Sequence, residues 1–413
     1  MALGVADIIF YSILFFSLYV QVFLLITYIE GKSSKLKSTE KNKISVYPTA
    51  AVLVPCWNEE ATVQGTIESI LAMNYPKDKL SVVLIDDGSK DNTLEIMRSY
   101  ESNAQVKVLS QKNQGKHVAL NFAIENTHTD FIATLDADSF IDSEALMNVV
   151  SVFDENPELQ SVASSILIHK PKNLVQFAQK AEYEMSVYVK DVLARIGGLH
   201  VTPGPFSVFR RDIFDKVGMY KKAHNTEDIE IALRIQKAGY KIGYCSNSYV
   251  YTVSPDTILK LFKQRIRWTY GFFKNLNDYR GMIFNKNYSG LAFFTLPASI
   301  VALTIIPFVL AFVFYNIGVS AANLYIKVSA AGIDSLIPAF DSFNLYISTK
   351  TIILVLLYLS VLGAVMIGRH MSREKLNSWK DILLMILVSA TVAPVWVIKS
   401  MVDAARSHQS EWK

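Results

Sequence analysis

The chain has 413 residues, enough for two ordinary domains, and its formal net charge at pH 7 is only +4. So small a charge gives the whole chain no electrostatic reason to bind nucleic acid. Hydrophobic residues make up 51% of the sequence and are concentrated in blocks, which predicts an integral membrane protein.

The first block lies near the N-terminus. No charged residue occurs between Asp7 and Glu30, and residues 8–29 are long enough to cross the hydrocarbon core of a bilayer. A signal peptide is the alternative, but a basic start and a small-residue cleavage site are missing. We therefore expect residues 1–30 to form a transmembrane anchor and the lysine-rich residues 31–48 to form a basic cytosolic linker.

Strands alternate with helices from residue 49 onwards. The apolar runs 49–55, 80–85 and 106–109 are expected to be buried parallel strands, each followed by a helix. The first of these helices is expected to open at residues 56–60 and to run toward residue 71. The alternation predicts a doubly wound, Rossmann-like α/β sheet within residues 49–254. Neither G-x-G-x-x-G nor G-x-x-x-x-G-K-[ST] occurs, so a dinucleotide-binding fold and a P-loop are not supported.

Candidate ligand-binding residues follow the predicted strands. Glu59 and Asp87 can accept hydrogen bonds from a nucleotide base or a ribose, and Trp57 offers a stacking face. Lys116 supplies a point charge for a phosphate or a nearby carboxylate. The alternative is that each of these residues is a helix cap or a turn residue, as the Asp87-Gly88 pair illustrates.

The apolar run 131–135 stops at two carboxylates, Asp136 and Asp138. Residues i and i+2 of an extended chain point to the same side, so both carboxylates can face one site beyond the strand end, where open α/β sheets bind ligands. Two clustered oxygen ligands suit Mg²⁺ or Mn²⁺, which takes its other ligands from water and substrate phosphates. An acidic pair in a solvated turn is the alternative.

Two helices are predicted in the second half of the domain. Residues 171–196 are expected to form a long helix, and Thr226, Glu227 and Asp228 are expected to begin a second one that ends at Gly239. The helix dipole favours the ionised form of Asp228, which a general base needs. Acidic residues at this position can also serve only to complement the dipole.

Residues 255–290 are expected to form an amphipathic region at the membrane interface. Within it Gln264, Arg267 and Trp268 are spaced i, i+3 and i+4, so they share one face of a helix that starts near Thr257. A planar guanidinium can bind a diphosphate at two points, and an indole face suits a sugar ring.

Residues 291–400 are expected to hold about three further spans, at 291–316, 351–368 and 382–398, before a tail at 401–413. Basic residues follow the N-terminal span and separate the last two spans, whereas the loop 320–350 has few. This distribution predicts that the large central domain is cytosolic. In that reducing compartment the cysteines, Cys56 and Cys245, are expected to be packing residues and not a disulfide.

Six motifs together resemble the family 2 glycosyltransferases of GT-A fold. They are Val54-Pro-Cys-Trp-Asn-Glu59, Asp86-Asp-Gly-Ser89, Asn113-Gln-Gly-Lys116, Asp136-Ala-Asp138, Thr226-Glu-Asp228 and Gln264-Arg-Ile-Arg-Trp268. The last matches the Q-x-x-R-W of processive synthases, such as those of poly-β-1,6-N-acetylglucosamine, hyaluronan, chitin and cellulose. The resemblance covers approximately residues 50–271 and implies a mixed, Rossmann-like sheet with transmembrane and interfacial helices.

The resemblance also implies a role for each motif. Asp228 would be the catalytic base, accompanied by Glu227 and Thr226, and a metal ion would be held by Asp138 with help from Asp136. The nucleotide-sugar would contact Pro55, Trp57, Glu59, Asp87, Lys116, Asp136, Gln264, Arg267 and Trp268. The acceptor would contact Trp268, Gly204 and Phe206, although Gly204-Pro205 departs from the usual small-residue pair, which leaves the acceptor's identity open.

The implied activity is inverting transfer from a UDP-sugar, with UDP-N-acetylglucosamine favoured, onto a growing β-linked polysaccharide. Elongation would occur at the cytosolic face of the plasma membrane and be coupled to export. Four spans are few for a pore, so a small membrane partner or a homo-oligomer is expected to complete it. The alternatives are non-processive glycosylation of a lipid carrier or glycolipid, and a non-catalytic membrane component that senses nucleotide-sugars.

Overall fold

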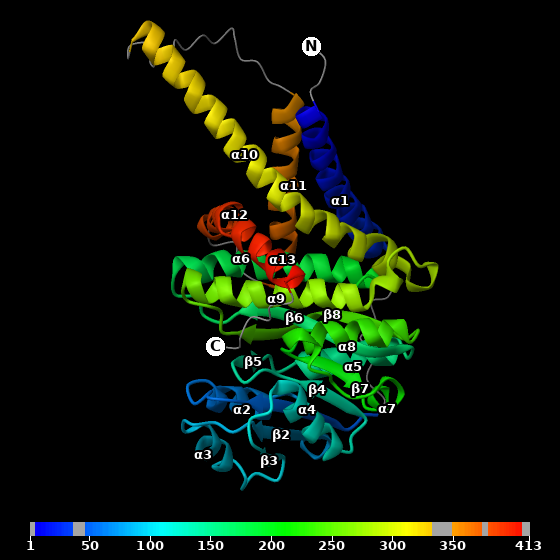
Figure 1. Cartoon of the computed structure of the whole chain (residues 1–413). Coiled ribbons are helices and arrows are strands. Elements are labelled where there is room, and N and C mark those ends of the chain that lie inside the picture. The colour runs from blue at the N-terminus through cyan, green and yellow to red at the C-terminus, as the bar shows by residue number, and fades with distance from the viewer. Residues whose placement is uncertain (1–4, 36–45, 333–348, 374–378, 407–413) are drawn as a thin grey trace.

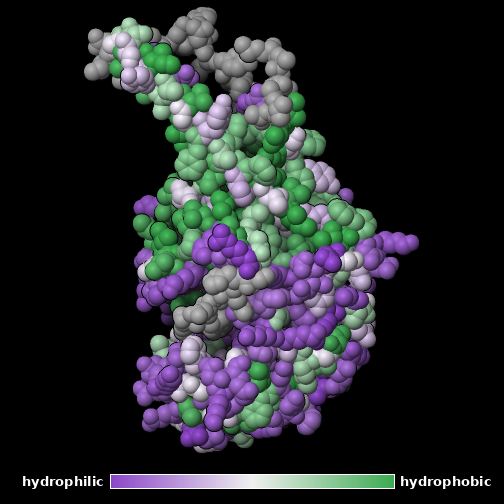
Figure 2. Space-filling view, in the orientation of Figure 1, coloured by the Kyte–Doolittle hydropathy of each residue, from purple (hydrophilic) through white to green (hydrophobic). Residues whose placement is uncertain are grey.

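The computed structural model describes residues 5–35, 46–332, 349–373 and 379–406. In Figure 1 a sheet domain lies at one end, long apolar helices rise from the other, and helices α6 (Leu174–Arg195) and α9 (Ile258–Asp278) lie crosswise between them. Figure 2 shows the same division, because the surface of the apolar helices is hydrophobic and that of the sheet domain is largely hydrophilic.

The sheet has eight strands in the order β3-β2-β1-β4-β7-β6-β8-β5. The strands are β1 (Ala50–Cys56), β2 (Leu80–Asp86), β3 (Val106–Ser110), β4 (Phe131–Thr134), β5 (Ser139–Ile141), β6 (Leu159–Ile168), β7 (Ser207–Arg210) and β8 (Lys241–Thr252). Strands β1 to β4 are parallel, β7 is antiparallel to both β4 and β6, β8 is parallel to β6, and β5 is antiparallel to β8. The expected mixed, doubly wound sheet is therefore confirmed.

Helices cover both faces of the sheet. They include α2 (Val63–Leu71), α3 (Thr93–Arg98), α4 (Lys116–Glu125), α5 (Ala145–Glu155), α7 (Ile213–Val217) and α8 (Glu227–Lys237). Alternate residues of β1 point to opposite faces, so Val52 and Val54 join one buried apolar cluster while Ala51 and Leu53 join another. Both cysteines, Cys56 and Cys245, are buried free thiols, as expected.

The helix that follows β1 begins later than the sequence predicts. Asn58 has a φ of 57°, and the carbonyl of Glu59 accepts hydrogen bonds from the N–H groups of Thr62 and Val63. Residues 57–62 therefore form a loop, and α2 begins only at Val63. The side chains that follow β1 therefore lie on a loop at the carboxyl end of the strand, where ligands of α/β sheets bind.

Among the described residues, three helices are long and apolar enough to cross a membrane. They are α1 (Val5–Lys35), α11 (Thr349–Met371), and α10 (Leu296–Ala331) with the π-helical turn Leu291–Thr295 before it. The helix that begins with the expected span 291–316 continues to Ala331 and comprises 41 residues. At about 1.5 Å per residue it is roughly twice as long as a bilayer core is thick.

The expected fourth span is a bent pair of helices, α12 (Lys380–Thr391) and α13 (Ala393–Ala405), which meet at 40°. The bend lies beside Pro394, which cannot donate the hydrogen bond that a continuous helix needs. Helix α12 packs on α6, and α13 packs on α9 and α10. Figure 1 shows the pair beside the crosswise helices, an arrangement that suits a broken span or a re-entrant loop.

A buried ion network joins the apolar helices to the sheet domain. Arg369 of α11 contacts Glu184 of α6 at 2.6 Å and also pairs with Asp381 of α12. All three side chains are at most 6% exposed. Helices α6 and α11 pack so closely at Gly368 that a Cβ atom there would overlap the carbonyl of Glu184. Helix α6 is thus fixed to both α11 and α12.

Candidate active site

The acidic pair lies in the loop between β4 and β5, at the carboxyl end of β4. Asp138 accepts hydrogen bonds from the hydroxyls of Ser139 at 3.1 Å and Thr252 at 3.4 Å, so its carboxylate is fixed against β5 and β8. Burial raises the pKa of Asp138 to about 7, and the nearby charges of Asp136 and Glu59 act in the same direction. Negative charge is therefore crowded at this edge of the sheet.

This donor set fits a hard divalent cation. The repulsion that raises the pKa of Asp138 would be relieved by a positive ion between it and Asp136. Over the ranges that the structure describes, no three His, Cys, Asp or Glu side chains converge to form a complete metal cage. Mg²⁺ and Mn²⁺ do not need one, since they are commonly held by one or two carboxylates together with water and substrate phosphates.

Lys116 joins the acidic pair to the predicted base motif. It is the first residue of α4, and its Nζ lies 2.6 Å from Asp136 Oδ1 and 3.1 Å from Glu227 Oε1. Burial disfavours the charged amine, but the two carboxylates outweigh it and raise the pKa of Lys116. Two motifs that are about ninety residues apart in the sequence thus share one partly buried ammonium group.

Asp87 holds the loop that carries Lys116. One of its oxygens accepts hydrogen bonds from Gln111 Nε2 at 2.7 Å and the N–H of Gln114 at 3.0 Å, and the other accepts from the N–H of Gly115 at 2.9 Å. The sequence predicted that Asp87 contacts the nucleotide. The structure gives it a positioning role as well, and a carboxylate with about four lone-pair sites retains capacity for a ligand.

The loop after β1 is joined to the loop after β2. The N–H of Asn58 donates to Ser89 Oγ at 3.1 Å, and the N–H of Glu59 donates to Thr93 Oγ1 at 2.8 Å. Pro55 is the penultimate residue of β1, and Trp57 and Glu59 follow the strand on this loop. These predicted nucleotide-binding residues therefore lie at the same edge of the sheet as Asp138, whose pKa Glu59 influences.

Thr226 fixes the start of α8 from inside the protein. Its hydroxyl donates to the carbonyl of Ala223 at 3.1 Å and accepts a hydrogen bond from Asn275 Nδ2 of α9 at 2.9 Å. The residue is only 2% exposed. Thr226 therefore positions Glu227 and Asp228, which follow it in the first turn of α8.

Glu227 and Asp228 have opposite pKa shifts. Burial and the charge of Glu227 raise the pKa of Asp228 to about 6, against the opposing effects of Lys116 and Arg267. Burial also acts against the ionisation of Glu227, but Lys116 outweighs it and lowers the pKa of Glu227. A carboxylate with a pKa close to neutrality is suited to proton abstraction. The backbone carbonyl of Asp228 accepts hydrogen bonds from the N–H of Thr202 at 3.2 Å and from its hydroxyl at 3.1 Å.

The loop before β7 lies directly over the acidic pair. A Cβ atom at Gly204 would lie 2.6 Å from Lys116 Nζ and 2.8 Å from the Asp136 carboxylate, so the close approach requires a glycine. Phe206, expected to contact the acceptor, has a φ of 54° and is fully buried in the apolar core. Its ring is thus part of the core, and only its backbone can line the site.

Helix α9 begins after Thr257, as predicted, and brings its motif to α8. Arg267 donates to the carbonyl of Asn225 at 3.3 Å and acts electrostatically on both Glu227 and Asp228. Gln264 Oε1 is buried without a hydrogen-bond partner. Such an acceptor is suited to a ligand that donates a hydrogen bond.

Sequence reasoning did not identify Arg265 or Thr202. Arg265 is 8% exposed, donates to Glu182 at 2.9 Å and lies 4.5 Å from the ring centroid of Trp268. The i, i+3 spacing of an arginine and a tryptophan could have indicated this stack. No comparable sequence signal exists for Thr202, because its partner Asp228 is distant in the chain.

Comparisons with known proteins identify the family of this chain. Residues 48–271 match the sequence profile described as glycosyltransferase like family 2. Poly-beta-1,6-N-acetyl-D-glucosamine synthases of Staphylococcus epidermidis and Staphylococcus aureus are 32% and 31% identical over 221 residues, which are 53% of this chain and 53% of each relative. The matched region thus spans about half the length of these curated relatives.

The fold also occurs in a solved structure. A mannosyltransferase from Pyrobaculum calidifontis, in complex with GDP-Man and Mn²⁺, superposes with a TM-score of 0.59 at 15% identity, over 96% of this chain and 99% of that one. At this identity the likeness bears on the fold alone. Since the family profile matches more than half of its residues, the chain belongs to glycosyltransferase family 2, with a GT-A-like mixed α/β sheet and three to four candidate membrane-spanning helices.

Proposed function

We propose that this chain is an inverting glycosyltransferase that uses a UDP-sugar, with UDP-N-acetylglucosamine favoured, to extend a β-linked polysaccharide. The observation that carries the proposal is the position of Lys116, which contacts Asp136 at 2.6 Å and Glu227 at 3.1 Å. It implies that the donor's diphosphate and the acceptor's hydroxyl can meet in one site. The choice of sugar and polymer is supported by the relatedness to poly-beta-1,6-N-acetyl-D-glucosamine synthases.

In the proposed reaction Asp228 removes the proton from the acceptor hydroxyl. The hydroxyl oxygen forms a bond to the anomeric carbon as the bond from that carbon to the diphosphate breaks, and UDP leaves. Attack on the face opposite the leaving group inverts the linkage. The pKa of Asp228, raised to about 6, leaves the carboxylate ionised at neutral pH while making it a better base than an exposed aspartate.

The residues around the proposed base would bind the metal ion, the diphosphate and the nucleoside. Asp138 and Asp136 would hold a Mg²⁺ or Mn²⁺ ion, which when bound neutralises charge on the departing diphosphate. Arg267 acts on the same charge from α9, where it adjoins Glu227 and Asp228. Glu59, Asp87 and Trp57 would bind the nucleoside.

The acceptor side of the site is proposed to lie between Gly204 and Trp268. The Gly204 backbone adjoins Asp136, and the ring of Trp268 is held in place by Arg265. An indole face provides an apolar platform for the C–H surface of a sugar ring. The acceptor would be the growing glycan.

We further propose that the domain 49–254 and the interfacial region 255–290 are cytosolic, with the anchor 1–30 and residues 291–400 in the plasma membrane. The lysines of linker 31–48 support this orientation. Export of the product would follow from the contact of α9 with α13, which joins the acceptor side to the membrane region. Because the part of the chain that the structure describes holds three to four candidate spans, a small partner subunit or a second copy would complete the exit path.

The test is an assay of full-length protein in detergent or nanodiscs with Mn²⁺ or Mg²⁺ and a panel of UDP-sugars. UDP release and product size are both measured. We expect release from UDP-N-acetylglucosamine and a long product. A product with one added sugar on a lipid would replace polymer synthesis by glycolipid synthesis, and the absence of UDP release from every donor would refute the enzymatic proposal.

A further inference from the structure

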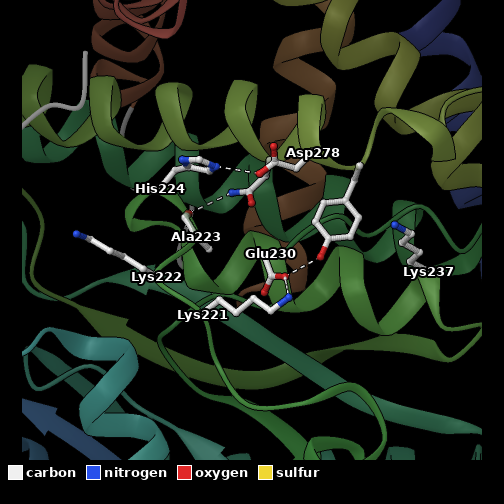
Figure 3. A pocket seen from close by; sticks show the side chains of 9 residues that line it. Lys221, Lys222, Ala223, His224, Glu230, Lys237 and Asp278 are labelled. Carbon is white, nitrogen blue, oxygen red and sulfur yellow. Dashed lines mark hydrogen bonds and ion pairs between the residues drawn. The ribbon is translucent and has the colours of Figure 1, made fainter. Parts of the chain in front are cut away.

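A pocket lies outside the proposed transfer site, between α8, α9 and the segment that precedes α8. Its volume is about 480 Å³, and Lys221, Lys222, His224, Lys237 and Tyr279 are among the residues that line it. Figure 3 shows Lys222 and His224 at one side and Lys237 at the other, with Lys221, Glu230 and Asp278 between them. None of the residues assigned to sugar transfer lines this pocket.

The pocket favours a negatively charged ligand. Its two carboxylates already have cationic or hydrogen-bonding partners, since Glu230 contacts Arg234 at 2.9 Å and the Tyr279 hydroxyl at 2.6 Å, and Asp278 contacts His224 at 2.9 Å. Lys221 lies 3.9 Å from Glu230 and remains 63% exposed. Lysine ammonium groups are the usual point-charge ligands of phosphates.

Asn275 adds an acceptor that has no partner. Its Nδ2 donates to Thr226 Oγ1 at 2.9 Å, to the carbonyl of Gly271 at 3.0 Å and to that of Ala223 at 3.4 Å, which fixes the orientation of the amide. Asn275 lines the pocket and is 0% exposed, yet its Oδ1 has no hydrogen-bond partner. A buried acceptor of this kind requires a donor, such as a ligand hydroxyl.

The wall of the pocket is a strained segment. Ala223, His224 and Asn225 have consecutive φ angles of 43°, 56° and 63°, a left-handed conformation that residues other than glycine rarely adopt. Such strain persists only where surrounding contacts hold it, and it is concentrated at functional sites. The next residues are Thr226 and the first turn of α8, so the segment leads directly to Asp228.

We propose that this pocket binds a phosphate ester that also carries a hydroxyl group. The phosphate would contact the ammonium groups of Lys221 and Lys222, and the hydroxyl would donate to Asn275 Oδ1. The ligand is either a soluble phosphorylated metabolite or the headgroup of a phospholipid, since both offer this chemistry. Binding holds the 223–225 segment in its strained conformation and so acts on the start of α8.

The experiment uses the full-length protein and two probes. Glycerol phosphate is titrated calorimetrically into protein in detergent, and hydrogen exchange of residues 221–228 is compared in phosphatidylcholine nanodiscs with and without phosphatidylglycerol. The variant is Lys221→Gln/Lys222→Gln. Its control is Lys241→Gln, which removes a lysine of similar exposure, 69%, from the β8 surface.

We expect at least one probe to bind saturably to the wild type and to Lys241→Gln, with slower exchange of residues 221–228. The double variant should bind at least tenfold more weakly. Binding of glycerol phosphate identifies a soluble ester as a ligand, and a response to phosphatidylglycerol alone identifies the lipid headgroup. Absence of saturable binding with both probes, or equal binding by the double variant, would overturn the proposal. Neither result depends on UDP release, so the test is separate from that of sugar transfer.

Discussion

A Cβ atom on Gly271 of α9 would lie 2.8 Å from Cβ of Thr226, and it would overlap the threonine hydroxyl. The helix that carries the Q-x-x-R-W residues therefore touches the residue immediately before α8. One turn further along α9, Asn275 donates to the same hydroxyl at 2.9 Å. The position of Asp228 thus depends on the packing of α9.

Gly271→Ala should displace Thr226 and with it the start of α8. Overpacking at a buried contact costs about 1–3 kcal/mol of stability, and we expect UDP release to fall by at least tenfold. Thermal unfolding and UDP release measure the two effects. The control is Gly281→Ala, because a Cβ at Gly281 meets no atom within 4 Å. Equal unfolding temperatures and equal UDP release in the two variants would show that the contact between Gly271 and Thr226 does not position Asp228.

Asp228→Asn should remove the base without changing the shape of the site. We expect kcat to fall by about 10²- to 10⁴-fold, the usual contribution of general base catalysis, while the dissociation constant for the UDP-sugar changes little. Single-turnover transfer and donor binding to the same preparation measure the two quantities. Turnover close to that of the wild type would remove Asp228 from this role.

The pH profile tests the same residue independently. Asp228 acts only when it is ionised, and its pKa is raised to about 6, so kcat/KM should rise with pH through about 6 and level off above it. Glu227→Gln removes a charge that raises this pKa and should move the rise to lower pH. A rise at the same pH in both proteins would mean that another group titrates.

Much of this site is predictable because four of the six motifs lie at the carboxyl ends of strands, those of β1, β2, β3 and β4. Parallel strands end at one edge of a sheet, so the order of residues in the sequence already brings Glu59, Asp87 and Asp136 together. The late start of α2 was not predictable from the sequence. It depends on hydrogen bonds from the N–H groups of Asn58 and Glu59 to hydroxyl groups about thirty residues further along the chain. Local propensity carries no information on such contacts.

Two other differences between the expected and the observed structure also arise from contacts between residues distant in the sequence. The burial of Phe206 depends on apolar residues from several strands, whereas the local sequence shows only a loop. The position of α12 and α13 depends on α6 and α9, which offer them a surface to pack against. The hydropathy of the sequence shows that these helices are apolar. It does not show whether they pack against lipid or against protein.

Lys116→Gln should remove the contact that joins Asp136 to Glu227. Loss of the ammonium group leaves Asp136 and Glu227 without their shared partner, and we expect kcat/KM at pH 7 to fall at least tenfold. Lys116 lowers the pKa of Asp228, so its removal should move the pH-dependent rise in rate to higher pH. The control, Lys107→Gln, removes an exposed lysine that bonds to the carbonyl of Asn126. An unchanged pH profile in Lys116→Gln would contradict the predicted coupling.

Removal of divalent ions should stop transfer. The acidic pair supplies only two carboxylates, so a bound ion exchanges readily with solvent and a chelator should abolish UDP release until Mg²⁺ or Mn²⁺ is restored. Asp138→Asn should raise the concentration of ion needed for half-maximal release. The control Asp215→Asn changes a carboxylate 65% exposed on α7. Full activity after chelation would exclude the proposed role of the pair.

The last prediction concerns the link between the membrane helices and the site. Arg369→Met would leave Glu184 and Asp381 buried without their common cation, which costs about 3–5 kcal/mol when one partner of a buried pair is removed. Combining it with Glu184→Gln and Asp381→Asn should recover much of that loss, because no unpaired charge then remains. Thermal unfolding in detergent measures both variants.

The matched control is Arg211→Met, whose ion pair with Asp215 is at the surface and is worth about 0–1 kcal/mol. Helix α6 carries Glu184 and also Glu182, which holds Arg265 at 2.9 Å beneath Trp268. Arg369→Met should therefore lower transfer even at temperatures at which the protein is folded, and Arg211→Met should not. If Arg369→Met shifts neither the unfolding temperature nor transfer beyond Arg211→Met, α6 does not connect the membrane region to the acceptor side.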